Sequence, residues 1–209
     1  MIHLNKNQEP LVLSRNKKSW KSKYRKALQS RNILPNNYNH PDIKQAVKVE
    51  THDKCAYCES KSSHSHWGDI EHILAKSKYP DLVFEWSNLT YSCAICNSNK
   101  SNYDDPKLPL LNPYVDDPNV FLNAVGPLVI HKLGNSRGEI TEKILKLNRN
   151  ELVEKRKERI LSINQLIDRW GQAKGSLKDL LGTEIKNEIA VDKEFSFVLK
   201  SYVAIQCNF

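Results

Sequence analysis

Two pairs of cysteines constrain this chain more than any other feature. They form the motifs Cys55-Ala-Tyr-Cys58 and Cys93-Ala-Ile-Cys96. Cysteines at i and i+3 let one tight turn present two thiolates to the same ion, and four thiolates satisfy a tetrahedral zinc ion. We therefore expect a structural Zn²⁺ site that joins the two ends of the intervening loop. Four thiolates leave no open position on the metal, so any catalysis belongs elsewhere.

The length and the N-terminal segment favour a cytosolic protein. A chain of 209 residues can bury one good core, with one compact unit or two tightly joined ones. The first residues lack the apolar core of a signal peptide, and no apolar run is long enough to cross a bilayer. We expect a cytoplasmic location, no membrane contact and reduced cysteines, with Cys207 serving only as a small apolar side chain.

The net charge of +8 lies entirely in the first 50 residues, because the remaining residues carry equal numbers of basic and acidic side chains. Basic residues there alternate with Trp20 and Tyr24, which can stack on bases or anchor a helix. The alternative is a solvated helix whose Trp20, Tyr24 and Leu28 turn to the core at four-residue spacing. The candidates for contact with a nucleic-acid substrate in this region are Lys17, Lys18 and Lys21.

The hydrophobic pattern predicts an α+β protein with a mostly helical body. Residues 1–15 are expected to be extended, and a second extended segment is expected to alternate Phe84 and Trp86 before Cys93. Thr141 is expected to cap a short helix, and Gly182 to separate the last two helices. The other expected elements are helices at about 17–31 and 41–51, a strand at about 70–73, a helix from about 96, a hairpin at 120–133 and a long helix from Asn150.

The loop between the cysteine pairs carries groups that phosphodiester hydrolysis needs. His72 can act as the base, and Asn88 can orient its segment. Glu71 and Asn97 can supply hard oxygens to a catalytic Mg²⁺ or Mn²⁺, and Lys100 can contact the phosphate. Adjacent residues on a regular strand point to opposite faces. Glu71 and His72 can therefore serve one site only if the strand ends or twists there.

These residues resemble the HNH nuclease family, also called the ββα-metal or His-Me finger nucleases. The resemblance implies that His72 is the general base, that Asn88 is the central structural asparagine, and that Glu71 and Asn97 bind the catalytic metal. Many members have histidine where this chain has Asn97, and aspartate or histidine where it has Glu71. The matching pattern is Glu71-His72, Asn88-Leu89 and Cys93-Ala-Ile-Cys96-Asn97-Ser-Asn99-Lys100.

A longer set of motifs resembles the PtuB branch of this family, found in Septu-type antiphage systems and in some retrons. That resemblance implies a nuclease effector held by a PtuA-type ATPase, and in retrons a reverse transcriptase with its RNA–DNA product. We divide the chain into a basic helical region at 1–50, a nuclease core at 51–105 and a helical region for partner docking at 106–209. The motifs are Ile70-Glu71-His72, Phe84-Glu-Trp86-Ser-Asn88-Leu89, Leu111-Asn112-Pro113 and the run from Thr141 to Arg156.

The rival interpretation is a zinc-stabilised module that binds nucleic acid or protein without catalysis. The four thiolates and the basic region would serve either function, but binding alone does not require Glu71, His72, Asn88 and Asn97 in one register.

The sequence leaves the substrate open between DNA and RNA, including transfer RNA. Asp69 is either a carboxylate near the ion or an exposed residue. The residues expected at the surface without a catalytic role are His64, His66, Arg149 and Arg156.

Overall fold

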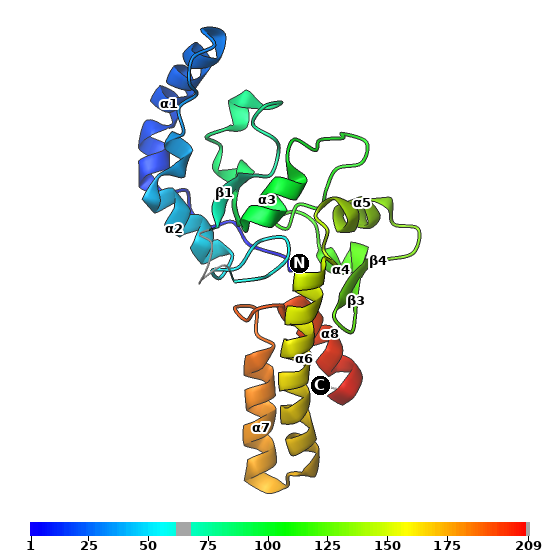
Figure 1. The fold of residues 1–209 in the computed structure, drawn as a ribbon. Coiled ribbons are helices and arrows are strands. Elements are labelled where there is room, and N and C mark those ends of the chain that lie inside the picture. The colour runs from blue at the N-terminus through cyan, green and yellow to red at the C-terminus, as the bar shows by residue number, and fades with distance from the viewer. Residues whose placement is uncertain (62–67, 208–209) are drawn as a thin grey trace.

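Helices and two small antiparallel sheets make up the computed structural model, which describes residues 1–61 and 68–207 (Figure 1). This agrees with the predicted α+β class. The helices are α1 (Leu11–Gln29), α2 (Pro41–Glu50), α3 (Ala94–Lys100), α4 (Pro118–Phe121), α5 (Ser136–Ile144), α6 (Asn150–Gln172), α7 (Gly175–Glu188) and α8 (Ser196–Cys207). The strands are β1 (Asp69–His72), β2 (Leu89–Ser92), β3 (Leu122–Val125) and β4 (Leu128–His131).

The centre of the molecule is a finger made of β1, β2 and α3. The two strands are antiparallel, with Asp69 opposite Ser92 and His72 opposite Leu89. Helix α3 follows β2 directly after Cys93, so the predicted order of strand, strand and helix is confirmed. The first cysteine turn joins this finger because the backbone N–H of Ala56 donates to the carbonyl of Tyr91.

The first 50 residues share a hydrophobic core with the finger. Leu13 and Tyr24 of α1 and Val47 of α2 are buried in one cluster with Ile70 and Phe84. Figure 1 shows α1 and α2 side by side against one flank of the finger. The basic region therefore packs as part of one core with the finger.

The aromatic residues of α1 belong to this core, as the second interpretation of the basic region expected. The ring centroids of Trp20 and Tyr24 lie 5.8 and 5.9 Å from that of Phe84. Tyr24 is buried and Trp20 is half-buried, whereas Leu28 is 45% exposed. The buried face of α1 therefore ends at Tyr24, one helical turn before Leu28, where the spacing predicted its end.

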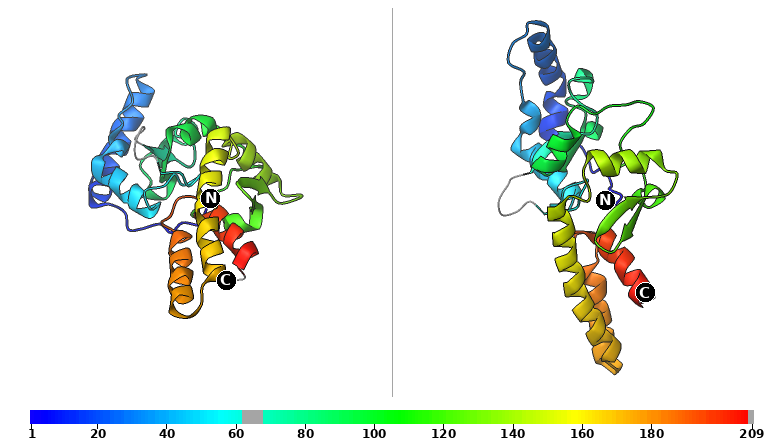
Figure 2. Two further views of the ribbon diagram at one scale, coloured as in Figure 1. Left: turned by 60° about the horizontal axis from the view of Figure 1, so that its bottom comes forward. Right: turned by 45° about the vertical axis from the view of Figure 1, so that its right-hand side comes forward.

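The C-terminal helices form a separate cluster around Ile163, Leu181, Ile185 and Leu199. In both views of Figure 2 the paired helices α6 and α7 extend away from the finger. A third cluster surrounds the four cysteines and includes Leu122, Leu145 and Leu152. The start of α6 is thereby fixed to the finger. No helix among the described residues is long and apolar enough to cross a bilayer.

Several local predictions are wrong for identifiable reasons. Helix α1 begins at Leu11 instead of residue 17, because Pro10 suits a helix start and Leu13 is fully buried. Phe84 and Trp86 do not lie on a strand. Trp86 begins the 3₁₀ turn Trp86–Asn88, and Phe84 lies between this turn and the 3₁₀ turn Pro80–Leu82. Both side chains are buried, so apolar alternation here reflects packing of a compact loop.

Two helix boundaries also differ from the prediction. Asn135 caps α5 by accepting a hydrogen bond from the N–H of Gly138, while Thr141 lies inside the helix. The buried hydroxyl of Thr141 accepts from the N–H of Leu111 instead. Gly182 is a buried residue inside α7, and residues 189–195 separate the last two helices.

Candidate active site

The four cysteines converge on one point. Their Sγ atoms all lie within 4.8 Å of one another and are buried. The Sγ atoms of Cys58 and Cys93 are 3.8 Å apart, which is about the separation expected for two ligands of a tetrahedral zinc ion with Zn–S bonds of about 2.3 Å. The quartet therefore fits structural zinc. No other group of three or more His, Cys, Asp or Glu side chains converges in this way among the described residues.

Arg149 lies beside this quartet, although the sequence placed it on a helix surface. Its guanidinium donates to the Sγ atoms of Cys96 at 3.7 Å, Cys58 at 3.7 Å and Cys93 at 3.8 Å. A fixed cation here offsets the excess negative charge of four thiolates around a divalent ion. Arg156 is also buried, and it donates to the backbone carbonyls of Leu147 and Pro127.

The side chains on the two faces of β1 make different contacts. Glu71 faces α3, where its Oε1 lies 2.7 Å from the Nζ of Lys100. Burial raises the pKa of Glu71, and Lys100 partly opposes that shift. The same Nζ donates to the backbone carbonyl of His72 at 2.8 Å. Lys100 is 2% exposed, so both of its named partners belong to the finger, and its expected contact with a phosphate gains no support.

Asp69 and Asn97 meet nearer the surface on the same face. The side-chain amide of Asn97 donates to Oδ2 of Asp69 at 3.4 Å, and both residues are half-buried. A carboxylate and an amide that can present its oxygen are suitable ligands for a hard divalent cation. This chemistry fits Mg²⁺ or Mn²⁺, with Glu71 next along the same face. Asp69 is a better-placed candidate than the sequence indicated.

His72 projects to the opposite face of β1. Its Nε2 lies 3.0 Å from the carbonyl oxygen of Val83, and because a carbonyl only accepts, the proton sits on Nε2 and Nδ1 is the basic nitrogen. The ring of Tyr38 stands edge-on to the imidazole with centroids 4.7 Å apart. Burial lowers the pKa of His72 to about 4 although the bond to Val83 opposes the shift. The histidine is therefore neutral and fixed in one tautomer near pH 7.

Asn88 holds the loop that follows His72. Its Oδ1 accepts from the N–H of Leu74 at 2.7 Å, and its Nδ2 donates to the carbonyls of Leu74 and Leu82. The backbone carbonyl of Asn88 also accepts from the N–H of Ile73. These contacts give Asn88 the geometry expected of a structural asparagine.

The lysines of α1 are mostly committed to ion pairs. Lys17 pairs with Glu9 at 2.9 Å and Glu85 at 3.0 Å, and Lys21 also pairs with Glu85. Lys18, which is exposed, is the remaining candidate of the three. Lys76 is an exposed cation close to the imidazole, since it donates to the hydroxyl of Tyr38 at 2.6 Å. No sequence pattern indicates Lys76, because its position depends on the loop that Asn88 holds. His64 and His66 lie outside the described residues.

Comparison with known proteins identifies the family of the chain. The HNH endonuclease family profile matches residues 55–103. The Septu protein PtuB of Bacillus thuringiensis is 33% identical over 149 residues, which cover 71% of this chain and 55% of that protein. The Septu protein PtuB of Bacillus mycoides strain KBAB4 is 30% identical over 200 residues, which cover 79% of this chain and 67% of that protein. This chain belongs to the PtuB family.

The chain spans about half to two thirds of the length of these PtuB relatives. The HNH match begins at Cys55 and ends just after α3, so it includes all four cysteines and the whole finger. The finger is therefore the part of the chain that the match to HNH endonucleases supports most directly.

Proposed function

We propose that this chain is the nuclease of a Septu-type antiphage system and that it hydrolyses phosphodiester bonds with a divalent ion. The observation that carries the proposal is His72, a buried and neutral imidazole whose Nε2 is fixed by Val83. Nδ1 is then available to take a proton from water at neutral pH. A module that only binds nucleic acid does not require a base held in this way.

The metal ligands in this proposal are Asp69 and Asn97, with Glu71 on the inner side of the same face. When bound there, Mg²⁺ or Mn²⁺ supplies charge neutralisation at the phosphate and at the leaving oxygen. Lys100 holds the carboxylate of Glu71 and the carbonyl of His72 in one arrangement. We assign Lys100 to positioning and Lys76 to contact with the phosphate.

The thiolates have a different task in this proposal. Cys55, Cys58, Cys93 and Cys96 hold a structural Zn²⁺ that ties the first cysteine turn to the start of α3. Its loss should unfold the finger, because the metal links segments that are far apart in the sequence. The chain thus contains a closed structural site and a separate site rich in oxygen ligands.

The proposed partner is a PtuA-type ATPase, and in a retron also a reverse transcriptase with its RNA–DNA product. This proposal rests on membership of the PtuB family. The C-terminal helices α6, α7 and α8 are the proposed docking region, because the pair α6 and α7 extends away from the finger (Figure 2).

Substitution of the proposed base tests the function. The wild-type chain and His72→Ala are incubated with DNA and with RNA in Mg²⁺ or Mn²⁺, alone and with the neighbouring gene products. Cleavage should occur with the wild type and vanish with His72→Ala, while zinc content stays unchanged and the variant stays folded at the assay temperature. Retained cleavage by the variant would overturn the assignment. Binding without any nicking by the wild type would favour the zinc-stabilised binding module.

A further inference from the structure

A cavity of about 370 Å³ adjoins the finger and has no role in the hydrolysis described above. Ile73 and Leu74, which directly follow His72, form part of its wall together with Asn88 and Lys100. The opposite wall comes from the connector between α3 and α4 and from Arg137 of α5. Its volume falls within the range of about 300–1,000 Å³ typical of small-molecule sites.

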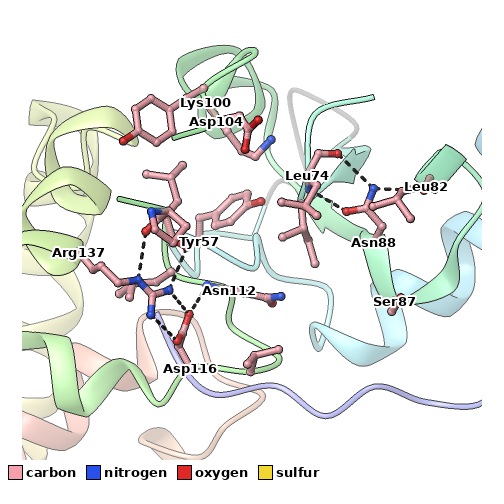
Figure 3. Close-up of a pocket in the computed structure, with 16 residues that line it drawn as sticks. Tyr57, Leu74, Leu82, Ser87, Asn88, Lys100, Asp104, Asn112, Asp116 and Arg137 are labelled. Atoms are coloured by element: carbon pink, nitrogen blue, oxygen red, sulfur yellow. Dashed lines mark hydrogen bonds and ion pairs between the residues drawn. The ribbon is translucent and has the colours of Figure 1, made fainter. Parts of the chain in front are cut away.

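The walls of this cavity are mostly apolar. Leu74, Leu82, Leu111 and Val115 line it. The connector is held in place by Arg137, whose guanidinium pairs with the carboxylate of Asp116 at 2.7 and 2.9 Å and donates to the carbonyl of Leu110 (Figure 3). Such walls suit the faces of a flat and uncharged ring system.

Tyr57 contributes the polar group that has no partner. This residue is 1% exposed and lines the cavity, and its hydroxyl makes no hydrogen bond within the described part of the chain. Figure 3 shows Tyr57 between the Arg137–Asp116 pair and Leu74 with Asn88. A buried hydroxyl without a partner costs about 1–3 kcal/mol, so a ligand that bonds to it is favoured.

We infer that this cavity binds an unpaired nucleobase of the nucleic-acid substrate, with the hydroxyl of Tyr57 bonding to an edge of the base. The inference rests on the proposed nuclease function. The cavity wall continues directly from the catalytic strand, so the nearest ring system is a base adjacent to the cut phosphate. A paired base keeps its hydrogen-bonding edge in the duplex, whereas a base in a loop or single strand can enter a pocket. The preferred substrate is then single-stranded or looped at the cut.

The test uses Tyr57→Phe, which keeps the ring and removes only the hydroxyl. A pool of single-stranded oligonucleotides of random sequence is cleaved, and the product ends are sequenced. The wild type should prefer one base at a fixed position from the cut. Tyr57→Phe should reduce that preference by about tenfold, as expected for loss of one buried hydrogen bond, with zinc content unchanged. Tyr103→Phe is the matched control, because the hydroxyl of Tyr103 already donates to the carbonyl of Leu108.

A second arm measures binding of free nucleosides by saturation-transfer NMR, which requires no cleavage. Wild type should bind, Tyr57→Phe should bind about tenfold more weakly, and Val115→Trp should block the cavity from an exposed position. Cleavage without base preference, or with a preference that Tyr57→Phe leaves unchanged, would overturn the pocket and leave the nuclease intact. Nucleoside binding without any cleavage would support the pocket and overturn the nuclease. Absence of both would overturn both.

Discussion

At the scale of single residues, Lys100 connects the two faces of β1. Its ammonium bonds to the carboxylate of Glu71 on one face and to the backbone carbonyl of His72, whose side chain lies on the other. Adjacent strand residues therefore point apart, as expected, and the two can still serve one site because β1 ends at His72 and a buried lysine links them. Glu71 and Lys100 depend on each other, because either charge would be buried without compensation if the other were removed.

The substitution Lys100→Met is expected to lower the free energy of unfolding by about 3–5 kcal/mol. This is the usual cost of leaving one member of a buried ion pair without its partner. The double variant Glu71→Gln/Lys100→Met should recover most of that loss. Urea denaturation of the single and double variants measures both effects. The control variant Lys107→Met, at an exposed connector position, should change the free energy of unfolding little. If the losses from the two single substitutions simply added in the double variant, Glu71 and Lys100 would not be coupled.

His72 also makes stability depend on pH. Burial lowers its pKa from 6.5 to about 4, so between those pH values the unfolded chain binds more protons than the folded one. The free energy of unfolding therefore falls as the pH is lowered from 6.5 towards 4.

The contribution of His72 should amount to about 2 kcal/mol between pH 7 and pH 5. Urea denaturation of wild type and His72→Gln at both pH values isolates the contribution of His72. Any loss of zinc at the lower pH affects both chains equally and cancels in the comparison. His3→Gln, at an exposed histidine, serves as the control. An equal loss of stability in wild type and His72→Gln would refute the pKa argument.

At the scale of secondary-structure elements, α6 begins at the zinc site. Arg149 is its N-cap residue and reaches three of the four cysteines. The helix that carries the proposed partner-docking region is thus attached to the structural metal. Local spacing cannot reveal such a contact, because Arg149 and Cys58 are far apart in the sequence.

Arg149→Gln is expected to weaken zinc binding by about 10–100-fold, the usual effect of removing a hydrogen-bond donor to metal ligands. Competition with a chromogenic chelator measures the change. Arg169→Gln, in the last turn of the same helix and exposed, is the matched control. Equal zinc affinity in both variants would show that Arg149 does not act on the thiolates.

The loop after β1 depends on Asn88. Asn88→Ala removes three hydrogen bonds to Leu74 and Leu82 and should lower the free energy of unfolding by about 2–3 kcal/mol, at about 1 kcal/mol per bond. Cleavage should fall as well, because the segments beside His72 lose their support. Thermal denaturation and a cleavage assay measure the two effects, with Asn123→Ala at an exposed β3 position as control. A stable but inactive Asn88→Ala would point to a direct chemical role.

The sequence predicted the finger well because its signals are local. Two CxxC spacings, a strand at about 70–73 and a helix carrying Asn97 and Lys100 each depend on a few neighbouring residues. The partners of Lys17, Lys100 and Arg149 could not be predicted, since each pairing depends on segments distant in the chain. Helix α1 was predicted too short because burial of Leu13 depends on the finger it packs against.

At the scale of the whole molecule, three clusters give the chain its organisation. The first joins α1 and α2 to the finger, the second surrounds the cysteines, and the third holds α6, α7 and α8 together. Several basic side chains of the first 50 residues form ion pairs with acidic side chains of the same chain. The finger lies between the basic helices and the C-terminal helices, so substrate and partner can engage different parts of the molecule (Figure 1).

We propose that two metal systems coexist in this molecule, a thiolate zinc that builds the finger and a separate divalent ion that supports hydrolysis. Removal and return of the weak ion tests it most directly. Purified protein is dialysed to remove Mg²⁺ and Mn²⁺, zinc is quantified by mass spectrometry, and cleavage is followed before and after the ion is restored. We expect cleavage to disappear and to return with Mg²⁺ or Mn²⁺ while zinc stays at about one ion per chain. Cleavage that persists without these ions, or that follows zinc content alone, would contradict it.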